Sequence, residues 1–321
     1  RVPAPADLGS LLPHPRDGFL IVTVCWIVSA LLGAAPFMLS GSIPDFFVAF
    51  FESCSGFSTT GATALSDVEI LPKSILFWRS FTHWIGGMGI LIFAIALMPS
   101  LGINGQNIAV SEAPGPTLDK ITPKMSDTAK ALYTTYFVFT IVETILLCLG
   151  GVSLYDSLLH TFGSVGTGGF SDYNNSVAHF DSVYAEMVIT FFMILSGANF
   201  NLYYMSLKDG ISSIFRDAEF RFYLFIIGAS TILIAANLFF SGFYSSIGQS
   251  LRYSVFQTST IITTTGFATD NFDLWPTFSK MILILLMFVG GCASSTGGGI
   301  KVVRILVLLK LIRSEEHTSE L

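Results

Sequence analysis

Charged side chains are scarce in this sequence, since Asp, Glu, Lys and Arg make up only 12% of its 321 residues. Soluble globular domains carry about 25% charged residues. Apolar residues account for 52% of the chain, and its mean hydropathy is +0.67. The shortage of charge excludes an ordinary soluble domain, and the long apolar runs predict an all-α polytopic membrane protein.

Basic residues and paired cysteines are also few. The net charge is −6, which argues against nucleic acid as a partner. The four cysteines are scattered without CxxC spacing, so neither disulfides nor a metal site is expected. The five histidines are dispersed and form no HExxH motif, and residues 297–301 lack the GK[ST] ending of a phosphate-binding loop. A polytopic membrane enzyme is therefore only a distant alternative.

The sequence does contain an internal repeat of three short polar runs. Each run follows an amphipathic segment too short to cross a bilayer and precedes a longer apolar segment. Aligned on Gly61, Gly168 and Gly266, the runs recur at intervals of roughly one hundred residues, which is typical of a repeated structural unit. The three runs are residues 58–63, 164–170 and 263–269.

The composition of these runs predicts walls of an ion filter. Glycine among hydroxyl residues lets the backbone adopt left-handed or extended conformations, so that successive carbonyl groups can point into one lumen. Irregular backbone at membrane depth is tolerated only where it lines a cavity or is buried in protein. A ring of carbonyl oxygens can replace the water shell of an alkali cation.

A glycine-rich stretch interrupts the last apolar segment. Residues 290–300 contain five glycines and three hydroxyl residues. Each glycine inside a helix costs about 1 kcal/mol relative to alanine, so this stretch is expected to be unwound. An unwound segment at membrane depth must face a cavity or the protein interior.

Basic residues predict the orientation of the chain. With six predicted spans, only Lys73, Arg79, Arg252 and Lys280 fall on one side, and all other Lys and Arg residues fall on the opposite side. The positive-inside rule places that opposite side, and the N-terminus with it, in the cytoplasm. The three polar runs then open outward.

The predicted division of the chain follows the repeat. It comprises a cytoplasmic N-terminal arm (1–16), a first helix–pore-helix–helix unit (17–99), a cytoplasmic loop (100–130), a second unit (131–207), a cytoplasmic loop (208–219) and a third unit (220–312) with an intramembrane loop at 290–299. Residues 313–321 are predicted to be a non-native tail, because this charged string abruptly interrupts an apolar helix.

At these motifs the sequence resembles the Trk/Ktr/HKT superfamily of potassium transporters, most closely the bacterial TrkH/TrkG membrane subunits. The resemblance implies tandem helix–pore-helix–helix (M1-P-M2) units around one potassium pathway, of which this chain matches three and lacks a fourth. It covers about residues 17–312 and rests on the three polar runs, Phe77-Trp-Arg-Ser, His83-Trp-Ile-Gly-Gly-Met-Gly89, Pro114-Gly-Pro116, Lys120-Ile-Thr-Pro123 and residues 290–304.

The same resemblance implies the site residues. Potassium would be coordinated by the backbone carbonyls of Thr59, Thr60, Gly166, Thr167, Thr264 and Thr265, and the filter glycines would be Gly61, Gly168 and Gly266. The gating loop would be formed by Gly290, Gly291, Ser294, Ser295, Thr296, Gly297, Gly298 and Gly299.

The resemblance also implies the setting and the partners. It implies a homodimer in the bacterial plasma (inner) membrane with a cytosolic, TrkA-like nucleotide-binding regulatory subunit. K+ would be the transported ion, and no organic cofactor is expected. Potassium uptake through a gated filter is the leading interpretation, and a sodium-coupled or sodium-permeable transporter is the alternative. Gly61 favours potassium, because sodium-permeable plant relatives often carry Ser there.

Overall fold

The computed structural model describes residues 15–89 and 125–319. The N-terminal arm, nearly all of the loop at 100–130 and the motifs between Pro114 and Pro123 lie outside these residues. Within the described ranges every regular element is a helix, and the only strand-like pairing is an isolated bridge between Val289 and Ile300. The predicted all-α fold is confirmed.

Three long apolar helices begin the three repeats: α1 (Pro15–Leu39), α6 (Met125–Leu149) and α11 (Ala218–Phe240). Each is long and apolar enough to cross a membrane. Each ends two residues before a glycine in the left-handed region, and these glycines are Gly41 (φ 71°), Gly151 (φ 90°) and Gly242 (φ 72°). A left-handed glycine just past a helix is a common stop signal.

Three short helices follow: α2 (Phe46–Phe57), α7 (Leu154–Val165) and α12 (Ile247–Ile262). Their N-caps are Asp45, Ser153 and Ser246, each of which accepts a hydrogen bond from a backbone N–H of the first turn. At about 1.5 Å per residue these helices are shorter than a hydrocarbon core of about 30 Å. Each packs against the long helix that precedes it, so its C-terminal end stops inside the bundle.

A third helix completes each repeat: α3 (Lys73–Gly87), α8 (Val183–Ser196) and α13 (Thr277–Met287). These pack against α2, α7 and α12 respectively. Of the six predicted spans, three appear among the described residues as single helices that meet the length and composition of a span, or four when a bent pair is counted as one. α3 runs on into residues that are not described, and α13 stops before the glycine-rich stretch.

The sequence predicts a span from about Val183 to Leu207, and the structure breaks this segment near Gly197. α8 ends at Ser196, and α9 (Phe200–Asp209) leaves it at an angle of 89°. Gly197 caps α8, while the Asn199 side chain accepts a hydrogen bond from the N–H of Asn201 and starts α9. The carbonyl of Gly197 also accepts a hydrogen bond from the N–H of Cys292, at 2.8 Å, so the glycine-rich stretch contacts the chain at the bend.

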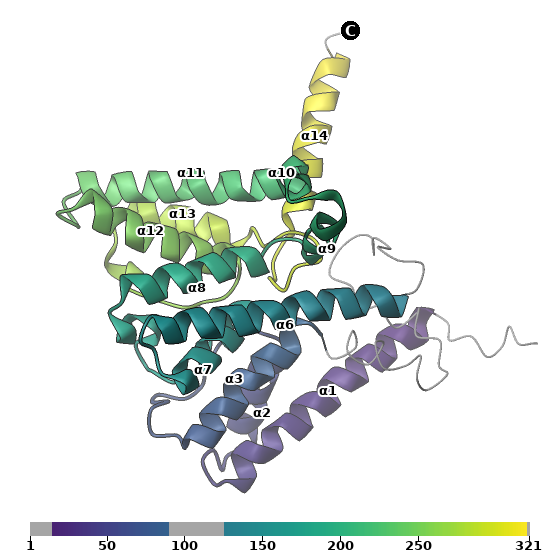
Figure 1. The fold of residues 1–321 in the computed structure, drawn as a ribbon, viewed down its shortest axis with the longest axis vertical. Coiled ribbons are helices and arrows are strands. Elements are labelled where there is room, and N and C mark those ends of the chain that lie inside the picture. Colours follow the sequence, from purple (N-terminus) through teal and green to yellow (C-terminus); the bar gives the residue numbers. More distant parts are fainter. Residues whose placement is uncertain (1–14, 90–124, 320–321) are drawn as a thin grey trace, which may run out of the picture.

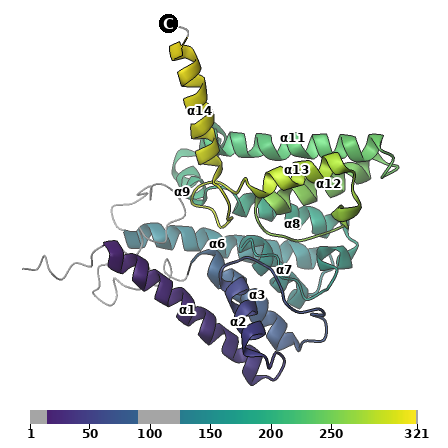
Figure 2. The same cartoon turned by 180° about the vertical axis from the view of Figure 1, so that it is seen from behind.

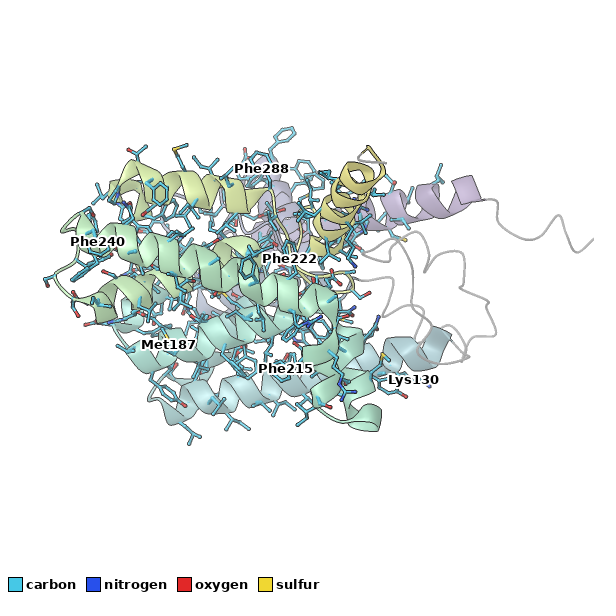
Figure 3. The ribbon with its side chains drawn as sticks, turned by 90° about the horizontal axis from the view of Figure 1, so that it is seen from above. Lys130, Met187, Phe215, Phe222, Phe240 and Phe288 are labelled. Carbon is cyan, nitrogen blue, oxygen red and sulfur yellow. The ribbon has the colours of Figure 1, made fainter. Side chains whose placement is uncertain are left out.

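The helices form a bundle in which α6, α8 and α11 run roughly parallel, with α1, α2 and α3 at one end (Figure 1). The short helix α10 (Ser212–Arg216) lies between α9 and α11, and α14 (Val302–Ser319) projects away from the bundle (Figures 1 and 2). Two 3-10 turns cover Ser176–Phe180 and Phe272–Leu274. Large apolar side chains such as Phe240 and Phe288 point outward (Figure 3), as expected where lipid surrounds a bundle.

Candidate functional site

The backbone repeats itself just past the three short helices. The residue two positions beyond each helix is a threonine with positive φ, an uncommon conformation for a residue other than glycine. Its N–H bonds back to the last turn of the helix at 3.0–3.2 Å. These residues are Thr59 (φ 53°), Thr167 (φ 53°) and Thr264 (φ 59°). All three polar runs therefore leave their helices through the same turn.

The second polar run has a different register from the one that the sequence alignment predicts. Two positions past these threonines stand Gly61 (φ 73°), Gly169 (φ 77°) and Gly266 (φ 87°). The backbone thus matches Gly61 with Gly169, and the alignment on Gly168 is wrong by one residue. Gly168 matches Thr60 and Thr265, while Gly166 caps α7 as Ser58 caps α2. The sequence Thr-Gly-Gly offers two glycines, and only the torsion angles show which of them is left-handed.

The three runs lie side by side in chain order. A Cβ atom added to Gly61 would lie 1.9 Å from the carbonyl oxygen of Gly168. One added to Gly169 would lie 2.0 Å from the carbonyl oxygen of Thr265. Gly61 and Gly169 therefore each face the carbonyl of the next run at a distance that admits no side chain. Gly266 has the same backbone but no described atom within 4 Å of an added Cβ.

The amide groups of each run turn back toward its short helix. The N–H groups of Thr60, Gly168 and Thr265 donate to the helix backbone at 3.0, 2.8 and 2.9 Å. Buried carbonyl groups are normally paired as well. Among the hydrogen bonds of the described residues, none ends on the carbonyl oxygens of Thr59, Thr60, Thr167, Gly168, Thr264 or Thr265. The carbonyl of Gly166, by contrast, accepts from the Thr167 hydroxyl at 2.8 Å.

The glycine-rich stretch, residues 290–299, lies against the second and third runs. The N–H of Gly298 donates to the Thr264 hydroxyl at 2.7 Å. The Thr296 hydroxyl lies 3.2 Å from the carbonyl of Val165, the last residue of α7, and 3.1 Å from that of Ser196, the last residue of α8. Ser294 has positive φ (53°), and its carbonyl accepts from the N–H of Phe200 at 3.1 Å.

Two charged residues that the sequence did not single out hold this stretch. Glu219, near the start of α11, accepts from the N–H groups of Ala293 at 2.7 Å and Val303 at 3.1 Å. The buried ammonium of Lys301 donates to the carbonyl of Gly297. Glu219 stands 74 residues before Ala293 in the chain, so no local pattern could have connected the two.

Asp172 lies just past the second run and is buried. Its Oδ1 atom lies 3.8 Å from Nδ1 of His160. Burial raises the pKa of Asp172 from its ordinary 3.8 to about 7; the neighbouring Asp156 adds to the rise, and Lys73 opposes it. The neutral acid is therefore favoured in the folded protein. The raised pKa contributes to the free energy of unfolding, and this contribution is fully present below pH 3.8. It is lost as the pH rises through about 7.

If the three polar runs line a cation pathway, as the sequence predicts, uptake of cations is expected to fall as the external pH drops from 8 to 6. Asp172 gains a proton over that range, and one negative charge beside the second run is lost. At low external Rb+ concentration, the expected decrease in Rb+ uptake is about two- to five-fold. This is the size of effect expected when one screened charge near the entrance of a pathway is lost. The measurement is initial Rb+ uptake against external pH in the whole protein. Asp172→Asn is the comparison, and its uptake should not fall in this pH range. If the variant shows the same pH dependence as the wild type, Asp172 is not the group responsible.

Comparisons with known proteins identify the family of the chain. A family model described as TrkH, cation transport protein, matches residues 10–321. The Trk system potassium uptake protein TrkH of Escherichia coli K12 is 40% identical over 299 residues, covering 92% of this chain and 62% of that protein. The TrkG protein of the same strain is 38% identical over 303 residues, covering 94% and 62%.

A solved structure gives the same result. The crystal structure of the potassium transporter TrkH from Vibrio parahaemolyticus matches with a TM-score of 0.81 and 37% identity, over 96% of this chain and 63% of that chain. The present chain thus spans about three fifths of the length of these relatives. They are named as potassium uptake proteins or transporters, not as enzymes, which removes the enzyme alternative.

Proposed function

Because the chain belongs to the TrkH family of cation transport proteins, we propose that it builds most of the wall of a potassium-selective pathway in a bacterial inner membrane. The observation that carries this proposal is the set of three backbone-equivalent runs, in which the glycines of the first two, Gly61 and Gly169, face the carbonyls of the next run. Carbonyl oxygens in such a ring can replace the water shell of K+. An inside-negative potential contributes about 2.3 kcal/mol per charge per 100 mV to uptake.

The register of the second run revises the proposed coordinating groups. Gly166 lies at the helix end, and its carbonyl already accepts from a hydroxyl, so we replace it by Gly168. Gly169 then takes the place of Gly168 as the filter glycine of the second run. The proposed ligands are the carbonyls of Thr59, Thr60, Thr167, Gly168, Thr264 and Thr265.

We further propose that a fourth run, beyond this chain, closes the ring. Run two is flanked on both sides and Thr167 is fully buried, whereas Thr60 and Gly266 are exposed. Gly266 has the backbone of Gly61 and Gly169 but faces no carbonyl. A fourth run between the third and the first would supply that carbonyl.

Residues 290–299 are proposed to gate the pathway, because they contact the second and third runs.

The predicted homodimer, the cytosolic nucleotide-binding subunit and the cytoplasmic N-terminus belong to the same proposal. The relatives are named as members of a Trk system, which supports an assembly of several subunits. The sodium-coupled or sodium-permeable alternative is less favoured, because the first run carries Gly61 where sodium-permeable plant relatives often carry Ser.

Rescue of a potassium-uptake-deficient bacterium at low external K+ tests this function. The 321-residue chain is compared with a version extended to the length of its relatives, and Rb+ and Na+ uptake are measured in parallel. We expect rescue by the extended version only, with Rb+ preferred over Na+. If the extended protein is made in the membrane with its regulatory partner and carries both ions equally, potassium selectivity is refuted. If the 321-residue chain also rescues growth, without the added residues, the four-run ring is refuted.

A further inference from the structure

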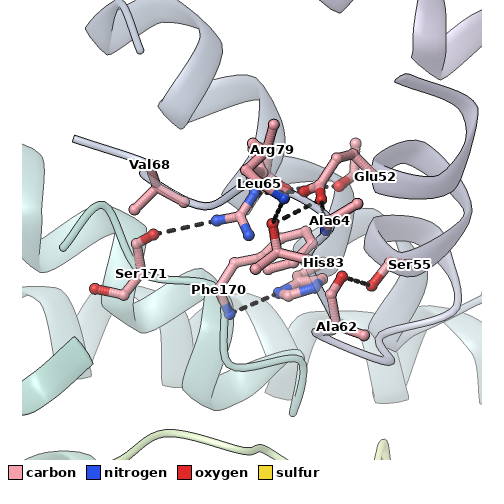
Figure 4. Close-up of polar contacts among 12 residues, drawn as sticks. Glu52, Ser55, Ala62, Ala64, Leu65, Val68, Arg79, His83, Phe170 and Ser171 are labelled. Atoms are coloured by element: carbon pink, nitrogen blue, oxygen red, sulfur yellow. Dashed lines mark hydrogen bonds and ion pairs between the residues drawn. The ribbon is translucent and has the colours of Figure 1, made fainter. Parts of the chain in front are cut away.

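A buried ion pair lies beside the segments that follow the first and second runs (Figure 4). Nε of Arg79, on α3, is 2.9 Å from Oε2 of Glu52, on α2, and their side chains are 3% and 0% exposed. A buried ion pair is weak evidence for stability, because apolar residues of similar volume often serve a core as well or better. The position of this pair therefore calls for a more specific explanation.

Glu52 holds the chain as it leaves the first run. Its Oε1 atom accepts from the Thr63 hydroxyl at 2.6 Å and from the N–H of Ala64 at 2.7 Å. Three residues along α2 from Glu52, the Ser55 hydroxyl donates to the carbonyl of Ala62 at 2.6 Å. The carboxylate is thus shared between Arg79 and the end of the first run, at Thr63 and Ala64.

Arg79 holds the chain as it leaves the second run. Its Nη1 donates to the carbonyl of Ser171 at 3.1 Å. Its guanidinium carbon lies 3.4 Å from the centre of the Phe170 ring. His83, one turn further along α3, stacks on the same ring with centroids 4.0 Å apart, and the ring lies between the two side chains in Figure 4. Phe170 directly follows Gly169, so its placement fixes the end of the second run.

His83 extends this contact into the second run. A Cβ atom added to Gly168 would lie 2.3 Å from Cγ of the His83 ring, so ring and run are in direct contact. The carbonyl of Gly168 is also the atom that faces Gly61 of the first run. One face of α3 therefore touches the second run at Gly168, Phe170 and Ser171, and through Glu52 it reaches the first run.

We propose that Arg79 is a positioning residue for ion selectivity, which sets the spacing between the first and second runs through Glu52 on one side and Ser171 and Phe170 on the other. This inference rests on the proposed function, because it assigns a role in the filter described above. Arginine suits the task better than lysine. Its planar guanidinium donates in several fixed directions and stacks on a ring at the same time, whereas an ammonium is a compact point charge.

Arg79→Lys in the full-length protein tests the inference. The variant keeps the positive charge beside Glu52 but loses the stacked plane and the fixed second donor. We expect the ratio of Rb+ to Na+ uptake to fall at least about tenfold, while protein remains in the membrane. A purely structural role would lower the amount of protein and scale both fluxes equally, so the ratio is the informative readout.

Arg252→Lys is the matched control. Arg252, on α12, makes a two-bond ion pair with Glu186 of α8 at 2.6 and 2.7 Å and lies 5.1 Å from the centre of the Tyr253 ring. Among the described residues, no hydrogen bond, ion pair or ring contact of Arg252 involves the three runs. We expect this control to keep the wild-type ratio of Rb+ to Na+ uptake.

Phe170→Leu keeps the inference testable if Arg79→Lys does not reach the membrane. It retains an apolar side chain but removes the ring between Arg79 and His83, so we expect the Rb+ to Na+ ratio to fall as well. The role of Arg79 would be overturned if the wild type is selective and Arg79→Lys keeps the same Rb+ to Na+ ratio. Phe170→Leu decides in the same way if it has to replace Arg79→Lys. Either result would leave the proposed function intact. A wild type without selectivity would overturn both.

Discussion

Gly61→Ala is expected to remove potassium-selective transport from the whole protein, and Gly169→Ala is expected to do the same. At each position the new Cβ would lie 1.9–2.0 Å from a carbonyl oxygen of the neighbouring run, a distance that forces the two backbones apart. The positive φ adds backbone strain of roughly 1–2 kcal/mol. Because carbonyls on adjacent runs would coordinate the same ion, we expect at least a tenfold loss of Rb+ preference over Na+, measured by parallel uptake.

Gly41→Ala separates the clash from the strain. Gly41 has φ of 71°, close to the 73° of Gly61, but an added Cβ there meets no described atom within 4 Å. This variant therefore carries a similar backbone penalty without pushing on a carbonyl. We expect it to lose some stability and to keep its selectivity. Equal selectivity in Gly61→Ala and Gly41→Ala would refute the placement of the filter.

The sequence predicts the helices well where the signals are local. An amphipathic segment too short to cross a bilayer is predicted before each polar run, and the structure has a short helix in each of these places, with N-caps Asp45, Ser153 and Ser246. A left-handed glycine follows each long helix, where the apolar run stops. Run length and capping are properties of neighbouring residues, so they can be read without knowing what packs against the helix.

The errors arise where distant residues decide the local conformation. Gly197 and Asn199 stand within an apolar stretch, and the chain bends there, where the N–H of Cys292 donates to the Gly197 carbonyl. Either of two glycines in the second run could take the left-handed position. The structure places Gly169 there, next to the carbonyl of Thr265, where no side chain would fit. The sequence marks Arg79 as a basic residue on the minority side and as part of the Phe77-Trp-Arg-Ser motif. Its partner Ser171 stands 92 residues later in the chain, so no local pattern reveals their contact.

These contacts also explain why the candidate site needs the whole bundle. No run is held only by its own short helix. The first run depends on α3 through Arg79 and Glu52, and the third contacts the glycine-rich stretch through Thr264 and Gly298. A change that moves α3 or residues 290–299 is therefore transmitted to carbonyl groups far away in the sequence.

Shortening the glycine-rich stretch by removing residues 294–297 is expected to raise Rb+ flux about tenfold or more in the whole protein. The deletion removes the Thr296 hydroxyl, which is 3.2 Å from the Val165 carbonyl and 3.1 Å from that of Ser196. The segment would then no longer reach the ends of α7 and α8, beneath the second run. A structural kink without a gating role would instead give loss of membrane protein, measured by quantitative immunoblotting alongside the flux.

Thr296→Val gives the graded form of the same test, because it keeps the shape of the side chain and removes only the donor. A typical hydrogen bond contributes about 1 kcal/mol net, so release of the segment should raise Rb+ flux about fivefold. Thr134→Val is the control, since the Thr134 hydroxyl donates to the Lys130 carbonyl at 2.8 Å on the exposed side of α6. If Thr296→Val leaves flux unchanged or lowers it while the control behaves as wild type, the contact with Val165 does not hold a gate closed, and residues 290–299 serve packing alone.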